Sequence, residues 1–128
     1  MKHIARTLTI ALPLLTTVQA ATPIKVETES GTVIAGSNSY KTLYTYQNDS
    51  EGVSTCYDEC AKQWPPHFAE YWDEPDKPGG TFTIVDRKDG KKQWAKHGKP
   101  LYFSSLDEKK GDTNGDGADG LWQAARPE

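Results

Sequence analysis

A segment of this chain recurs 58 residues further on. KTLYTYQND, which starts at Lys41, aligns without a gap with KPLYFSSLD, which starts at Lys99. Over 24 aligned positions, seven residues are identical. The identical pairs are Lys41 and Lys99, Leu43 and Leu101, Tyr44 and Tyr102, Asp49 and Asp107, Thr55 and Thr113, Asp58 and Asp116, and Trp64 and Trp122. Such similarity indicates two copies of one unit that cannot bury its apolar face alone.

We place the repeats at about residues 41–66 and 99–127. Each has a Leu-Tyr pair typical of a short strand, then an Asp, a polar loop and a closing Trp. We therefore expect a domain with pseudo-twofold symmetry. The aromatic residues that we assign to its core, rather than to a ligand-binding surface, are Tyr44, Tyr102, Trp64 and Trp122.

Turn signals separate several β-branched or alternating segments. Ser30-Gly31 and Asp89-Gly90 are typical of hairpins, and His97-Gly98 is typical of a further tight turn. The predicted strands are residues 25–28, 32–35, 81–85, 93–95 and 101–104. A helical turn is expected only at Asp58–Gln63, before Pro65 and Pro66 end it. The predicted fold is a mainly β, small antiparallel domain with at most short helices.

Aromatic residues must supply much of the interior. Residues 21–128 contain only 14 Leu, Ile, Val and Phe, about 13% of the segment, which is low for a folded domain. Four Trp and six Tyr compensate, since each large aromatic side chain can bury roughly 150–250 Å². A covalent staple would stabilise a domain with so few aliphatic residues.

The first twenty residues, MKHIARTLTIALPLLTTVQA, are typical of a secretory signal peptide. Lys2 and Arg6 precede an apolar run, small residues precede the expected cleavage after Ala20, and Pro13 disfavours a core helix. No Cys directly follows the run, so we expect no lipid anchor. The expected product is a single domain of residues 21–128 in the bacterial periplasm or secreted medium.

Charge narrows the classes of partner. Residues 21–128 hold 13 basic and 18 acidic residues, a net charge of −5. Such a surface repels nucleic acid and anionic lipid. We expect no nucleic-acid partner and no membrane anchor in the mature chain. Cations and neutral ligands remain plausible, and the expected partner is an unknown small ligand or protein.

Cys56 and Cys60 lie in CYDECAKQWPP. An even cysteine count in an exported chain favours a disulfide, although a regular helix would keep the two Cβ atoms too far apart. The alternatives are a copper or redox site with a distant His67 or His97, or zinc bound by all four residues. We interpret the two histidines most simply as surface or turn residues.

Asp112, Asn114 and Asp116 alternate in a glycine-rich loop, as in the first half of an EF-hand calcium site. Asp119 could add a ligand, but Gln123 holds the place of the bidentate Glu. The alternative is a solvated loop in which glycines allow positive φ. Calcium is therefore the one cofactor that we keep as an alternative to none.

Asp49 and Asp107 end the repeated strands, where an Asp side chain commonly caps the turn that follows. Their alternative role is that of a pair of hydrolase carboxylates. We rank this role last and expect no enzyme.

The motifs LYTYQND, CYDECAKQWPP, DGKKQWAKHGKPLYF and GDTNGDGADGLW, in this order, resemble a family of secreted repeats with a Tyr-x-aromatic-x-x-Asp motif. Members are known as predicted lipoproteins of unknown function. The resemblance covers about residues 33–127. Tyr44, Tyr46 and Asp49 match the motif, but in the second repeat Ser104 replaces the aromatic residue between Tyr102 and Asp107. The resemblance implies an exported protein of two repeats and names no reaction.

Together these observations predict an exported non-enzymatic protein with a binding or structural role and an unknown ligand. The alternative is a periplasmic metal-binding protein, with calcium at Asp112–Asp116 or copper and redox chemistry at Cys56 and Cys60.

Overall fold

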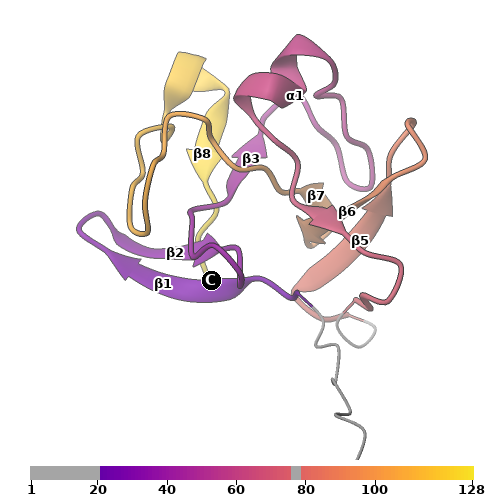
Figure 1. Ribbon diagram of the computed structural model, residues 1–128, viewed down its shortest axis with the longest axis horizontal. Coiled ribbons are helices and arrows are strands. Elements are labelled where there is room, and N and C mark those ends of the chain that lie inside the picture. The colour runs from indigo at the N-terminus through magenta and orange to yellow at the C-terminus, as the bar shows by residue number, and fades with distance from the viewer. Residues whose placement is uncertain (1–20, 76–78) are drawn as a thin grey trace, which may run out of the picture.

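The computed structural model describes residues 21–75 and 79–128, so the predicted signal peptide at residues 1–20 lies outside the described residues. The described chain is mainly β, with antiparallel strand pairs and one short α-helix (Figure 1). This confirms the predicted fold class. Within those two ranges, no helix combines the length and apolar character needed to cross a bilayer.

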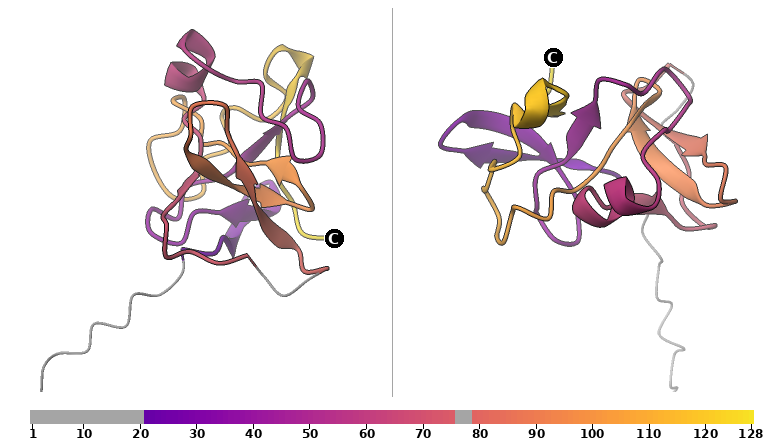
Figure 2. Two further views of the ribbon diagram at one scale, coloured as in Figure 1. Left: turned by 90° about the vertical axis from the view of Figure 1, so that its right-hand side faces the viewer. Right: turned by 90° about the horizontal axis from the view of Figure 1, so that it is seen from above.

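Two hairpins form the ends of the molecule. Strands β1 (Ile24–Thr28) and β2 (Gly31–Ala35) pair at one end, and β5 (Phe82–Asp86) and β6 (Lys92–Lys96) pair at the other (Figures 1 and 2). Gly31 and Gly90 turn the chain with φ of 106° and 83°, values that favour glycine. Both hairpins stand where the sequence predicts them.

Short strands join the two ends. Strand β3 (Tyr44–Tyr46) pairs with β8 (Trp122–Ala124), while β4 (Phe68–Ala69) and β7 (Lys99–Pro100) both pair with β6. The strand predicted over residues 101–104 is wrong in its bounds. Regular pairing with β6 stops at Pro100, because Tyr102 turns away to form isolated bridges with Tyr44 and Pro66.

The two halves of the chain exchange their ends. The Ala125 amide donates to the Leu43 carbonyl at 2.8 Å, and the Ile34 amide donates to the Ala125 carbonyl at 2.7 Å. In the other half the equivalent bonds, of 3.0 and 2.9 Å, join His67 to Leu101 and Trp94 to His67. Residues from the end of each half therefore complete the backbone pairing of the other half.

Helix α1 (Glu59–Gln63) lies in the predicted position. It follows Asp58, whose φ of 53° breaks any helical path from Cys56, and Pro65 and Pro66 follow shortly after its end. A single 3₁₀ turn, η1 (Ala118–Gly120), precedes β8 in the glycine-rich loop. Both helical segments are therefore only about one turn long.

The core has two parts. One surrounds the aromatic residues of the repeats and contains Val26, Val33, Ala35, Tyr44, Cys56, Trp64, Tyr102, Trp122 and Ala124. The other lies against the second hairpin and contains Ile34, Leu43, Trp94, Leu101 and Ala125. Both draw residues from the two halves of the chain, so neither half encloses a core of its own.

Candidate functional site

Tyr44 and Tyr102 pair where the repeats meet. Their amides and carbonyls exchange two backbone hydrogen bonds, of 2.7 and 2.9 Å. Each hydroxyl donates to the Asp of the other repeat: Tyr44 Oη lies 2.7 Å from Asp107 Oδ2, and Tyr102 Oη lies 2.7 Å from Asp49 Oδ2. The residues that define the sequence repeat thus link the repeats to each other.

The second oxygen of each carboxylate holds a loop. Asp49 Oδ1 accepts the Thr55 amide and hydroxyl at 2.8 and 2.7 Å, and Asp107 Oδ1 accepts the Asn114 amide at 2.8 Å. Burial raises the pKa of the Tyr44 hydroxyl and also raises the pKa of Asp107. The tyrosines therefore remain protonated donors. One oxygen of each carboxylate accepts a tyrosine hydroxyl and the other holds a loop, so both oxygens stabilise the fold.

Trp64 and Trp122 stack at the same junction, with ring centroids 3.9 Å apart and planes 2° from parallel. Tyr46 stacks on Trp122 at 4.2 Å. Its counterpart Ser104 is small, and a Cβ placed on Gly115 would lie 2.8 Å from Trp64 Cη2 and 2.9 Å from Ser104 Oγ. The missing aromatic residue of the second motif therefore leaves room for the backbone of Gly115 beside Trp64.

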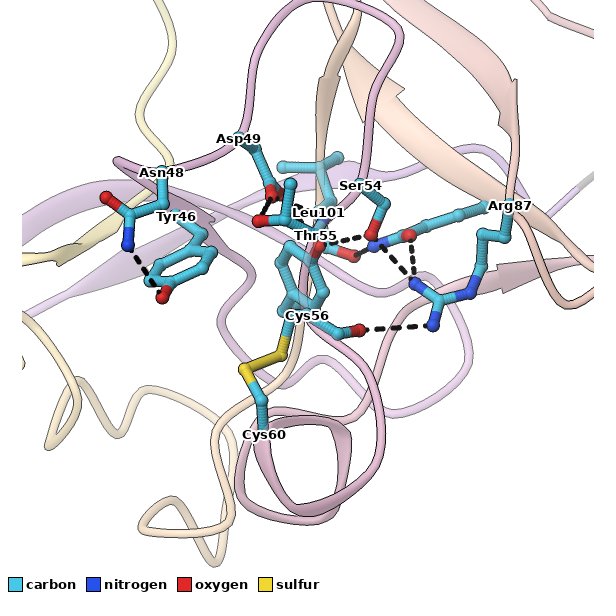
Figure 3. Close-up of a disulfide and its surroundings, with 11 residues drawn as sticks. Tyr46, Asn48, Asp49, Ser54, Thr55, Cys56, Cys60, Arg87 and Leu101 are labelled. Carbon is cyan, nitrogen blue, oxygen red and sulfur yellow. Dashed lines mark hydrogen bonds between the residues drawn. A yellow bond between two sulfur atoms is a disulfide. The ribbon is translucent and has the colours of Figure 1, made fainter.

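Cys56 and Cys60 form the predicted disulfide, with Cα atoms 5.3 Å apart (Figure 3). The departure from helical geometry at Asp58 allows the approach that a regular helix forbids. Cys56 is fully buried in the aromatic core. Neither cysteine is a free thiol, and the described residues contain no group of three or more His, Cys, Asp or Glu suited to a metal ion.

Arg87 is buried beside this disulfide. Its Nη1 donates to Ser54 Oγ at 2.9 Å and to Gln93 Oε1 at 2.8 Å, and its Nη2 donates to the Cys56 carbonyl at 3.1 Å (Figure 3). Asp89, in the hairpin turn, provides the paired carboxylate at 3.1 Å. Through these contacts, Arg87 links the cysteine loop to the second hairpin. Sequence analysis missed it because its partners are scattered along the chain.

The three side chains proposed for calcium have other bonding partners. Asp112 Oδ2 accepts the amides of Glu108 and Lys109 at 2.9 and 3.1 Å. The other contacts join Asn114 Nδ2 to the Leu106 carbonyl, Asp116 Oδ1 to the Ala124 amide, and Asp116 Oδ2 to Arg126. These hydrogen bonds organise the loop without a metal ion, as the alternative interpretation expects. Calcium binding stays a prediction.

His67 is not a surface residue, which corrects the sequence interpretation. The exchange of ends places it between Trp94 and Leu101, where it is 7% exposed. Its Nε2 has no hydrogen-bond partner among the described residues. Burial lowers the pKa of the imidazole to about 4. The ring is therefore neutral near pH 7.

A hollow of about 650 Å³ opens where residues of β3, β6, β7 and β8 meet. Four basic residues and one acidic residue line it: Lys96, His97, Lys99, Arg126 and Asp116. The chain as a whole has a net charge of −3, so the lining reverses the overall sign. The sequence run KHGK contains three of these four basic residues, but the sequence analysis interpreted it only as a turn.

The backbone fixes the position of His97. His97 and Gly98 have φ of 48° and 81° in the turn between β6 and β7. Two consecutive positive φ values match a tight hairpin turn, in which Asn or Asp is the usual first residue. The turn itself is the predicted one. A histidine at this position projects an imidazole into the lining of the hollow.

A family described as a secreted repeat of unknown function matches the chain twice, over residues 25–67 and 83–126. Each matched segment takes in a hairpin as well as the Leu-Tyr pair, the Asp and the closing Trp. No significant match was found among curated proteins or solved structures.

Proposed function

Because this chain belongs to the family of secreted repeats of unknown function, we propose that it is an exported, non-enzymatic binding protein. In this proposal, cleavage after Ala20 releases residues 21–128 into the periplasm. The two repeats form the frame, and the cation-lined hollow receives a small polar anion.

The use of the motif residues supports a binding role for this frame. Tyr44 and Tyr102 donate to buried carboxylates, and the same carboxylates organise the two long loops. A catalytic acid or base needs a proton that substrate can reach. The hydroxyls of Tyr44 and Tyr102 are instead bonded to Asp107 and Asp49, so these pairs act as cross-links between the repeats. Such cross-links suit a rigid scaffold.

The observation that carries the proposal is the charge of the hollow. Lys96 has a side chain only 16% exposed, next to a turn that fixes His97. A partly buried ammonium group gains more from an anionic ligand than a fully solvated one does. The volume of about 650 Å³ lies within the range of small-molecule sites.

A thermal-shift screen of residues 21–128 tests the proposal. The panel contains small organic anions, inorganic phosphate, neutral sugars, Ca²⁺ and Cu²⁺. A ligand at a hundred times its Kd stabilises the native state by roughly 2.7 kcal/mol, which raises the Tm by roughly 11–22 °C. We expect this response with organic anions and its loss in Lys96→Met.

The matched control is Lys92→Met, since Lys92 lies on the same strand in an exposed pair with Asp86. Equal loss of the response in both variants would contradict binding at the hollow. Stabilisation by Ca²⁺ or Cu²⁺ with no response to anions would favour the metal-binding alternative instead.

A further inference from the structure

Glu128 places a carboxylate against two of the residues that line the hollow, Lys96 and His97. Its Oε1 lies 2.5 Å from His97 Nε2 and 3.4 Å from Lys96 Nζ. The electrostatic interaction with His97 is the main cause that lowers the pKa of Glu128, followed by the hydrogen bonds of Glu128 to His97 and Lys96. The chain thus provides its own anion at this position.

We propose that the hollow selects a small hydroxylated monocarboxylate and that Glu128 is its intramolecular competitor. This inference rests on the proposed function and adds to it the chemical class of the ligand and a built-in control of access. The Glu128 carboxylate stands in for the carboxylate of the ligand between Lys96 and His97.

Two of the four basic residues that line the hollow have other partners. Arg126 pairs with Asp116 at 3.3 Å and donates to the Ser30 carbonyl at 3.0 Å. Lys99 Nζ donates to the Asp49 carbonyl at 3.3 Å. Lys96 and His97 are the pair that meets an exchangeable anion, and two donors suit one carboxylate group.

The rest of the lining argues against a multiply charged ligand. Asp116 contributes a negative charge to the same hollow, which disfavours a phosphate dianion more than a carboxylate with a single charge. Thr45 and Gln123, opposite each other in β3 and β8, add a hydroxyl and an amide to the lining. These groups complement the hydroxyls of a sugar acid.

Glu128 can leave at low cost. Its side chain is 70% exposed, whereas that of Lys96 is 16% exposed. The Glu128 side chain stays largely exposed in its 3.4 Å contact with Lys96. Pairs of this kind contribute little to stability, so an incoming ligand displaces a weak contact. The apparent affinity falls by the fraction of molecules in which Glu128 occupies the site.

Calorimetric titration with D-glucuronate, with D-glucose as its neutral match and inorganic phosphate as a second anion, tests the inference. Removal of the competitor in Glu128→Gln is expected to tighten glucuronate binding about threefold, as an occupancy of two thirds would give. Lys96→Met and His97→Asn are expected to abolish binding, while Lys92→Met leaves it unchanged. Asn tolerates the left-handed backbone of His97, and backbone amide spectra verify that each variant is folded.

The outcomes separate the inference from the proposed function. Unchanged glucuronate affinity in Glu128→Gln overturns the competitor. Phosphate or glucose that binds as tightly as glucuronate, and depends on Lys96, overturns the carboxylate class while the hollow remains a binding site. If none of the three probes binds and none shifts the amides of Lys96 and His97, the inference and the proposed anion site both fail.

Discussion

Trp64 and Trp122 lie face to face with ring centroids 3.9 Å apart, although 58 residues of chain separate them. Each closes its own repeat, and Tyr44 and Tyr102 meet the two indoles edge-on at 5.4 and 5.2 Å. The most aromatic part of the core is therefore the contact between the repeats.

The contributions of Tyr44 and Asp107 to stability should be strongly coupled, because they share a hydrogen bond. Tyr44→Phe leaves the buried Asp107 carboxylate without its hydroxyl donor, which we expect to lower the free energy of unfolding by roughly 1.5–3 kcal/mol. Urea denaturation measures the loss. In Asp107→Asn the same Tyr44→Phe change should cost less, since no charge is then left unpaired. Tyr71→Phe, at an 88% exposed residue, is the control, and equal losses at Tyr44 and Tyr71 would contradict the contribution of the Tyr44 hydroxyl. An undiminished loss from Tyr44→Phe in the Asp107→Asn background would contradict the coupling.

The disulfide should contribute modestly to stability. It closes a loop of only a few residues, so the chain-entropy relation gives about 2 kcal/mol. For a domain of this size that corresponds to a fall in Tm of roughly 8–16 °C in Cys56→Ala/Cys60→Ala. Scanning calorimetry with and without reductant measures it. An unchanged Tm would mean that the aromatic core alone fixes the cysteine loop.

Stability should depend on pH through His67. Its pKa is about 4 in the folded protein, against about 6.5 when unfolded, so the unfolded chain binds more protons between these values. The contribution is complete above pH 6.5 and falls as the pH drops toward 4, by on the order of 3 kcal/mol. Denaturant midpoints across this range measure it. His67→Gln should remove that part of the pH dependence, and an identical pH profile in both proteins would contradict the buried neutral ring.

The two halves should remain joined after the connection between them is cut. A protease site engineered within residues 74–79 would separate residues that exchange their ends through Leu43, Ala125, His67 and Leu101. We expect the cleaved protein to elute as one species in size-exclusion chromatography and to separate only in denaturant. Each fragment alone should be unfolded by circular dichroism. Two fragments that fold separately would contradict the shared core.

The sequence allowed both hairpins, the short helix, the disulfide and the aromatic core to be predicted, because these depend on local turn signals and on composition. The similarity between the segments that start at Lys41 and Lys99 revealed two repeats, but not how these repeats pair in the fold. Ala125 pairs with Ile34 and Leu43, which lie far away in the sequence. No local sequence pattern predicts this pairing. The strand expected at residues 101–104 is wrong for the same reason, since its outcome depends on the distant Tyr44.

The same limit applied to the hollow. Lys96 ends strand β6 of the second hairpin and His97 directly follows it, whereas Arg126 follows β8, the strand that crosses to the first half. Only the exchange brings these residues together. The sequence analysis therefore identified the turn at His97 but not the positively charged site around it.

The placement of Ala125 also bears on export. Its backbone pairs with Ile34 and Leu43, so these residues lack their neighbour until the segment that contains Ala125 has crossed the membrane. A partly exported chain therefore exposes both halves with an incomplete shared core, which proteases can attack. We therefore expect resistance to digestion to arise in a single step, once the segment that contains Ala125 has been exported.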